Sequence, residues 1–144
     1  MSLPAGRQEI SIRNEYFRKL MITGIGIDII EISRIEESIA QYGDAFLSKL
    51  FTQNEINYCK AKQFPTQHYA ARFAAKEAFS KAVSTGWSGE FEWKNVEVKN
   101  NPAGKPDLLL YGKTAETLRG YSVFLSMSHS DTSVIAFVVI EKQS

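Results

Sequence analysis

The sequence predicts a single α+β domain in which helices pack on an antiparallel sheet. Three observations support this fold class. A strand-like segment comes first, helix-forming segments follow up to about residue 83, and the second half is mostly strand. The chain contains no linker, internal repeat or low-complexity tract that would divide it into two domains. With 144 residues, of which 44% are hydrophobic, it is long enough to bury one substantial core.

The composition argues against several classes of function. A net charge of +1 gives no general case for binding nucleic acid or membranes, so an acidic partner would need a local basic patch. Cys59 is the only cysteine, which rules out an intrachain disulfide and indicates a packing residue or an ordinary thiol. No Cys/His spacing suggests a zinc site. No apolar run approaches the ~20 residues that span a bilayer. The N-terminus also lacks the apolar core of a secretory signal, so we expect a cytoplasmic protein.

The strand-like segment follows a polar start. Residues 1–20 show no clean period, which predicts an N-terminal extension, disordered in part, before a domain that spans residues 21–144. Next, isoleucines alternate with Gly24, Gly26 and Asp28, and this period of two predicts a strand. The glycines allow close approach of a ligand or of another backbone. Taken alone, they slightly favour a bulge or a tightly packed helix.

Three helices are expected in the first half of the chain. The sequence SRIE at residues 33–36 fits a capping box, and it opens a helix that Gly43 can end. The sequence TQNE at residues 52–55 repeats this signature for a second, short helix. A third helix runs roughly over residues 67–83 and is stopped at residues 85–86.

The second half is predicted to be mostly strand. Val96 and Val98 alternate with polar neighbours. The tetrapeptide at residues 101–104 has Asn first, Pro second and Gly fourth, as type I turns prefer. The remaining expected elements are a strand over residues 108–111, a short helix near 114–118, and a closing hairpin of strands 121–128 and 133–141.

Residues 72–82, RFAAKEAFSKA, are the most informative stretch of the chain. They are rich in strong helix formers and contain no Gly or Pro. Phe73, Glu77 and Lys81 project from one helix face at four-residue spacing, and Arg72 and Lys76 form a cationic row beside it. One carboxylate near several cations is expected where a metal meets an anionic phosphate. The alternative is a surface ion pair between Glu77 and Lys81, worth about 0.2–0.5 kcal/mol.

Five motifs occur in order along the chain. They are GIGIDIIEI at residues 24–32, Phe51-Thr52 followed by Glu55, RFAAKEAFSKA at 72–82, NPAGKP at 101–106 and SMSHS at 126–130. Together they resemble the bacterial holo-acyl-carrier-protein synthases, which belong to the 4′-phosphopantetheinyl transferase superfamily. Each motif alone is modest, but the ordered set covers about residues 21–141 and is highly specific.

The resemblance implies a 4′-phosphopantetheinyl transferase fold and a reaction. Such enzymes move the 4′-phosphopantetheine arm of coenzyme A to a serine of an apo acyl carrier protein and release adenosine 3′,5′-bisphosphate. The family requires a divalent cation, normally Mg²⁺. It is typically a homotrimer with its active sites at the junctions of neighbouring subunits. The serine hydroxyl attacks the β-phosphorus, so charge on the pyrophosphate must be held while the bond breaks.

By resemblance, Asp28 and Glu77 are the two Mg²⁺ ligands. Magnesium commonly binds one or two carboxylates together with phosphate oxygens and waters, so the remaining ligands would not be protein atoms. The place of Asp28 on the glycine face of its strand supports this assignment independently. Lys81 matches the active-site lysine that neutralises or protonates the departing phosphate. Either Asp28 or a metal-bound water would deprotonate the carrier serine.

The resemblance also implies a set of coenzyme-binding residues. Arg72 and Lys76 would hold the phosphates, although Arg72 could equally anchor its helix to an acidic neighbour. The loop at residues 101–106 would lie against the adenine, and otherwise it is only a turn. His129 would contact phosphate or is a solvated hairpin residue. The full set is Arg72, Lys76, Thr85, Gly86, Asn101, Pro102, Gly104, Lys105, Pro106, Ser128 and His129.

Carrier docking is where the chain departs from the family pattern. The family meets acidic carrier proteins with arginines on its first long helix, and Arg34 occupies such a position. Glu36, Glu37 and Asp44 weaken the expected basic stripe. Recognition is therefore predicted to rely more on Arg34, Lys49 and apolar contacts, and a contribution from the N-terminal extension is the alternative.

Two other classes of function compete with the enzyme. One is a module that binds coenzyme A or a nucleotide without transferring anything. The other is an assembly subunit whose charged helix only joins protomers. The intact set of Asp28, Glu77 and Lys81 argues against the binding module. A trimer with no affinity for coenzyme A would support the assembly subunit.

Overall fold

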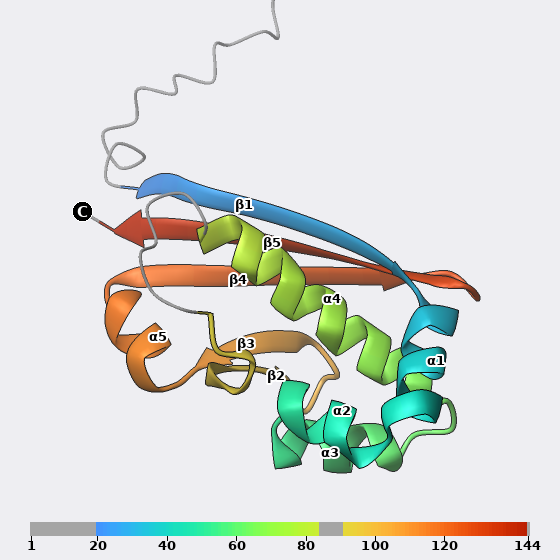
Figure 1. The fold of residues 1–144 in the computed structure, drawn as a ribbon. Coiled ribbons are helices and arrows are strands. Elements are labelled where there is room, and N and C mark those ends of the chain that lie inside the picture. Colours follow the sequence, from blue (N-terminus) through green and yellow to red (C-terminus); the bar gives the residue numbers. More distant parts are fainter. Residues whose placement is uncertain (1–19, 84–90, 144) are drawn as a thin grey trace, which may run out of the picture.

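The computed structural model describes residues 20–83 and 91–143, and it has the α+β architecture that the sequence predicts (Figure 1). Residues 1–19 of the predicted extension and the predicted helix stop at 85–86 lie outside the described residues. In chain order the elements are β1 (Leu20–Glu31), α1 (Ile32–Tyr42), α2 (Asp44–Leu50), α3 (Gln53–Lys60), α4 (Pro65–Val83), η2 (Trp93–Asn95), β2 (Val96–Asn100), β3 (Pro106–Leu110), α5 (Gly112–Thr117), β4 (Tyr121–His129) and β5 (Ser133–Gln143).

Two antiparallel sheets carry the strands. β1, β5 and β4 form a three-stranded sheet with β5 in the centre, and β2 pairs with β3 in a separate two-stranded sheet. α4 crosses one face of the larger sheet, and α1, α2 and α3 gather near the N-terminal end of α4 (Figure 1). None of the helices in the described part of the chain is long and apolar enough to cross a membrane.

The core lies between α4 and the three-stranded sheet. Val134, Ala136, Val138 and Ile140 alternate along β5 and are buried, whereas the residues between them are more exposed. α4 meets the sheet with small side chains, chiefly alanines, so the helix can lie close to the strands. Full burial of a Val or Ile side chain contributes roughly 1.5–3 kcal/mol. The central strand is therefore the main apolar support of α4.

α4 touches β1 at the two glycines of that strand. A Cβ atom placed on Gly24 would lie 2.0 Å from the carbonyl oxygen of Ala82. A Cβ atom on Gly26 would lie 1.8 Å from the carbonyl oxygen of Ala78. The structure thus supports the tightly packed helix, and not an approaching ligand, as the reason for these glycines. Asp28 is the next residue on the same face and is therefore turned toward α4.

The start of α1 differs from the prediction. The capping box at residues 33–36 is wrong, because α1 begins at Ile32 and its N-cap residue Glu31 makes no side-chain capping bond. β1 instead runs directly into the helix. The backbone N–H of Ile32 donates to the carbonyl oxygen of Thr132 at 2.9 Å, so a distant turn satisfies this helix end. The helix ends at Gly43 as expected, but the short α2 that follows has no counterpart in the prediction.

The remaining local predictions hold closely. The second capping box is confirmed, since Thr52 Oγ1 accepts from the N–H of Glu55 and Glu55 Oε1 accepts from the N–H of Thr52. The predicted turn is confirmed by the 2.8 Å bond from the N–H of Gly104 to the carbonyl oxygen of Asn101. α4 begins at Pro65, because proline suits the first helical turn. The later strands and the short helix lie within two residues of their predicted starts.

Gly26→Ala is expected to destabilise the fold by about 1–3 kcal/mol or more, as overpacking of a dense interior does. The new methyl group would meet a backbone carbonyl of α4, which has no alternative rotamer, so the helix must move away from β1. Urea unfolding followed by circular dichroism measures the change. Gln41→Ala, at an exposed position of α1, is the control and should change the unfolding free energy by less than about 0.5 kcal/mol. Equal stability of Gly26→Ala and the parent would contradict this contact.

Candidate active site

Three charged side chains meet where α4 packs on β1. Asp28 lies on the glycine face of β1, and Glu77 and Lys81 lie one turn apart on α4. Lys81 Nζ donates to Asp28 Oδ1 at 3.0 Å and to the carbonyl oxygen of Ile27 at 3.0 Å. The close packing therefore joins groups that are 53 residues apart in the sequence.

A cavity of about 450 Å³ opens beside these residues, and both Asp28 and Glu77 line it. Its walls also include Phe73 from α4 and Arg34 from α1. The predicted helix face of Phe73 and Glu77 is thus turned toward the cavity. Arg34, predicted to dock the carrier, lies at the same opening. Lys49, the second predicted docking residue, is exposed on α2 and is not among the residues that line this cavity.

The ionised form of Glu77 is disfavoured at this place. Burial raises the pKa of Glu77 above its usual range, and the nearby Asp28 carboxylate raises it further, while Lys81 partly lowers it. The Asp28 side chain is 15% exposed and the Lys81 side chain is 52% exposed. A small cation between the two carboxylates would remove their mutual repulsion.

The two carboxylates fit a magnesium ion whose other ligands come from outside the protein. Within residues 20–83 and 91–143, no group of three or more His, Cys, Asp or Glu side chains could hold a metal by itself. Mg²⁺ usually keeps several waters and binds one or two carboxylates together with substrate phosphate. Asp28 and Glu77, which share one cavity, match this donor set.

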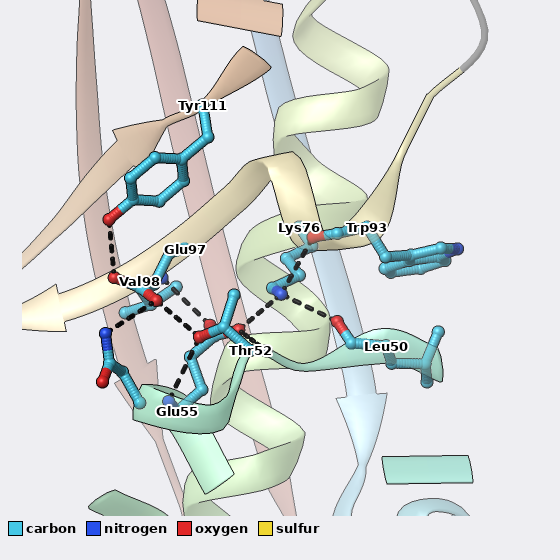
Figure 2. Close-up of polar contacts among 9 residues, drawn as sticks. Leu50, Thr52, Glu55, Lys76, Trp93, Glu97, Val98 and Tyr111 are labelled. Atoms are coloured by element: carbon cyan, nitrogen blue, oxygen red, sulfur yellow. Dashed lines mark hydrogen bonds and ion pairs between the residues drawn. The ribbon is translucent and has the colours of Figure 1, made fainter. Parts of the chain in front are cut away.

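Lys76 does not lie where a coenzyme phosphate could reach it. Its side chain is fully buried, and Nζ donates to Glu55 Oε1 at 2.6 Å and to the carbonyl oxygens of Leu50 at 2.8 Å and Trp93 at 3.0 Å (Figure 2). These acceptors engage all three N–H groups of the ammonium. Burial lowers the pKa of Lys76, and the Glu55 carboxylate opposes this. The structure therefore contradicts the prediction that Lys76 holds the coenzyme.

Arg72 is buried as well. Its guanidinium Cζ lies 4.2 Å from the ring centroid of Tyr58, and Nη2 donates to Asn100 Oδ1 at 2.9 Å. Of the two roles considered for Arg72, the structure supports the one in which it anchors its helix. The anchor is an amide on β2, however, and not the acidic neighbour that we expected.

The other predicted coenzyme residues form two groups. Ser128 and His129 line a cavity of about 300 Å³ at the end of β4 together with Ile29, which also lines the Asp28–Glu77 cavity. Asn101 and Pro102 line a separate cavity of about 520 Å³ on the β2–β3 hairpin. The first group therefore borders the candidate site. Gly104, Lys105 and Pro106 continue the hairpin, and Thr85 and Gly86 lie outside the described residues.

Two buried acidic residues near α4 were not predicted from the sequence. Glu55 is 1% exposed and Glu97 is 3% exposed. Glu97 stands between two valines in a predicted strand, which was the available signal for an unusual acidic position. The burial of Glu55 could not be inferred in the same way, because its place in the predicted capping box already accounted for an acidic residue there. Their partners come from distant parts of the chain, so no local pattern could show the pairing.

The comparison with protein families agrees with this geometry. A family model described as the 4′-phosphopantetheinyl transferase superfamily matches residues 24–138, a range that includes Asp28, Glu77, Lys81 and His129. The chain belongs to this superfamily. The resemblance drawn from the five motifs is thereby confirmed.

Individual relatives cover nearly all of the domain. A holo-[acyl-carrier-protein] synthase of Geobacter sp. (strain M21) is 46% identical over 125 residues, which are 85% of this chain and 100% of the relative. The crystal structure of the holo-[acyl-carrier-protein] synthase from Neisseria meningitidis matches with a TM-score of 0.78 at 39% identity, over 85% of this chain and 100% of that one. A Bacillus anthracis holo-(acyl-carrier-protein) synthase, solved in complex with CoA (3′,5′-ADP), matches with a TM-score of 0.71 at 42% identity, over 85% and 99%.

Glu77→Gln is expected to stabilise the metal-free protein at neutral pH. The raised pKa means that the folded chain holds the Glu77 proton more tightly than the unfolded chain, so stability from this group falls as pH rises through that pKa. The uncharged amide of the variant does not titrate, so the variant does not lose this stability as the pH rises. The gain should be less than about 1 kcal/mol, because the half-buried group is partly screened by water.

Thermal unfolding of parent and variant between pH 3.5 and pH 8 measures this effect, at about 0.5-unit steps around the usual carboxyl range. The advantage of Glu77→Gln should vanish at the acidic end, where the carboxyl is protonated in both states. Glu36→Gln, at an exposed position of α1, is the control. A stability gain that persists unchanged at low pH would contradict the electrostatic cause.

Proposed function

We propose that this member of the superfamily is a magnesium-dependent holo-acyl-carrier-protein synthase. It transfers the 4′-phosphopantetheine arm of coenzyme A to a serine of apo acyl carrier protein and releases adenosine 3′,5′-bisphosphate. The observation that carries the proposal is the meeting of Asp28, Glu77 and Lys81 beside one cavity. The names of the relatives, and the CoA complex of one of them, support the donor and the acceptor.

The transfer reaction requires charged groups at Asp28, Glu77 and Lys81. The serine hydroxyl attacks the β-phosphorus, and the bond from that phosphorus to the bridging oxygen of the α-phosphate breaks. Mg²⁺ held by Asp28 and Glu77 would neutralise charge on the pyrophosphate. Negative charge grows on the departing oxygen, and Lys81 is the proposed partner for it. The Lys81 side chain is 52% exposed, so it can turn toward an arriving anion.

Recognition of the two substrates is assigned to the cavity walls. Arg34 is the proposed contact for the acidic surface of the carrier, because it lines the same cavity as the carboxylates. Lys49, exposed on α2, would extend this contact. Ser128 and His129 are the proposed contacts for coenzyme phosphate, because their cavity meets the candidate site at Ile29. Asn101 and Pro102 would hold the nucleotide end of the coenzyme.

Asp28→Ala and Glu77→Ala are each expected to abolish transfer while the protein stays folded. Either change removes one of two carboxylates for the cation, and the rest of the core is untouched. Each variant is incubated with apo carrier, coenzyme A and Mg²⁺, and mass spectrometry follows the carrier. With the parent protein, the mass of the carrier should increase by ~340 Da, the mass of the transferred arm, which is set by the cofactor's chemistry.

Glu116→Ala, an exposed acidic position on α5, is the control and should keep the parent rate. Transfer at the parent rate by both site variants would remove the assignment. Binding of coenzyme A by the parent without any mass gain on the carrier would instead favour a binding module.

We further propose that the active form is a homotrimer with its sites at the subunit junctions. The face of the three-stranded sheet opposite α4 is apolar and open: Ile25, Ile27 and Ile29 of β1 are 54–67% exposed, and Phe124 and Phe137 follow on the neighbouring strands. Contiguous apolar faces of this kind usually mark an interface. Ile29 also lines the candidate cavity, so the face reaches the site.

Ile27→Lys is expected to break the trimer and to lower transfer together with it. Ile27 pairs with Phe137 of the adjacent strand, so the new ammonium would stand in the middle of the apolar face and be desolvated on assembly. Light scattering coupled to size exclusion measures the assembly. Phe64→Lys, at an equally exposed aromatic position before α4, is the matched control. A parent that is monomeric and fully active would contradict the proposal.

A further inference from the structure

A buried polar network lies between α4, α3 and β2 (Figure 2). Its lysine and both of its acidic side chains are almost wholly shielded from water. Burying a charged group costs free energy unless it has close polar partners. A network of this kind is therefore expected to have a structural or functional role. This Lys76 network comprises Thr52, Glu55, Lys76, Glu97 and Tyr111 with the backbone groups of Leu50, Trp93 and Val98.

Lys76 joins α4 to three separate segments. Its ammonium donates to the carbonyl oxygen of Leu50 at the end of α2, to Glu55 in α3, and to the carbonyl oxygen of Trp93 in η2. Each acceptor takes one N–H group, so a large sliding or rotation of α4 would break at least one bond. The three bonds therefore hold α4 in one position.

Glu55 extends this hold to the two-stranded sheet. Its Oε1 accepts from Lys76 and from the N–H of Thr52, and its Oε2 accepts from the N–H of Val98 on β2 at 3.0 Å. Glu97 on the same strand accepts from the hydroxyls of Thr52 and Tyr111. The network thus ties the helix that carries Glu77 to the hairpin proposed to hold the nucleotide.

The apolar contact of α4 with β1 is made by small groups. The helix meets β1 through Ala78 and Ala82 against glycine backbone, so few shaped side chains interlock there. Burial of apolar surface is favourable but has no direction. Buried hydrogen-bonded charges are directional, and in the interior they discriminate strongly between alternative arrangements.

We propose that Lys76 and Glu55 are positioning residues for phosphopantetheine transfer, and this inference rests on the function proposed above. Lys76 directly precedes Glu77, and successive helical residues point about 100° apart. Holding Lys76 in place therefore aims Glu77 at the cavity that it shares with Asp28. Such constellations need placement within about 0.5 Å and 10–20°.

The network also supports the cavity from a second direction. Lys76 holds the backbone of Trp93, and the Trp93 ring stacks on Phe73 with centroids 5.4 Å apart and an interplanar angle of 19°. Phe73 lines the Asp28–Glu77 cavity. The Lys76 ammonium thereby positions both the Glu77 carboxylate and the wall of the cavity that Phe73 forms.

The test must separate positioning from stability. Lys76→Met alone would leave the Glu55 carboxylate buried without its cation, which is strongly destabilising. The double variant Glu55→Gln/Lys76→Met removes both charges of this ion pair together, and neutral replacement of a buried pair often costs little stability. Circular dichroism and thermal unfolding should show a folded protein that lacks only the directional hold on α4.

The double variant is expected to lose about 10–100-fold in kcat, as loss of groups that orient metal ligands does. Mn²⁺, used as a paramagnetic probe in place of Mg²⁺ with coenzyme A present, should bind more weakly by a similar factor. The KM for the carrier should stay at the parent value, because Arg34 of α1 is not part of the Lys76 network. Glu116→Gln, at an exposed acidic position of α5 outside the Lys76 network, is the control and should keep the parent kcat and Mn²⁺ affinity.

A folded double variant with parent kcat and parent Mn²⁺ affinity overturns the positioning role. If the double variant does not fold, the single variant Lys76→Arg tests the positioning role instead. It keeps the charge beside Glu55, but a planar guanidinium cannot reproduce the three-way arrangement, so the same losses are expected and their absence overturns the role. A parent that binds Mn²⁺ but transfers nothing counts against the proposed function alone, because the comparison of Mn²⁺ affinities still tests the positioning.

Discussion

Backbone contact between α4 and β1 is the constraint on which the site depends. Two strand positions without side chains let a helix of small residues lie directly on the sheet. Only at this separation can a carboxylate on the strand reach an ammonium on the helix at 3.0 Å. A methyl group at Gly24 or Gly26 would widen the gap between the strand that carries Asp28 and the helix that carries Lys81.

Two lysines on the same helix show how burial decides the use of a charge. Lys76 is wholly enclosed and has three acceptors in fixed positions, so its charge serves to hold the fold together. Lys81, little more than one turn later, is half exposed beside Asp28. Its environment resembles water more closely, so exchanging one anion for another costs less. The first lysine suits a fixed support and the second suits an incoming phosphate.

Much of the fold could be predicted because its signals are local. Alternation marked β1, the capping box at residues 52–55 marked α3, and four-residue spacing placed Phe73 and Glu77 on one face. The features that were predicted wrongly all depend on contacts between distant parts of the chain. α1 starts at Ile32 because Thr132, a hundred residues away, satisfies its N–H. Lys76 resembled a surface cation because its acceptors come from three other segments, and no periodicity within α4 could indicate them.

The order of strands in the larger sheet has a consequence for how the protein is made. Among the described strands, β1 and β4 each pair with β5 and not with one another, so this sheet has no ladder until the last strand is present. The pairing of β1 with β5 joins distant parts of the chain and is slow, because the chain loses loop entropy before any contact compensates for it. During synthesis, the strand that bears Asp28 must therefore wait, with its isoleucines uncovered, until the C-terminal segment leaves the ribosome. A nascent chain arrested before β5 would hold every acidic and basic group of the site and yet have no sheet on which to assemble them.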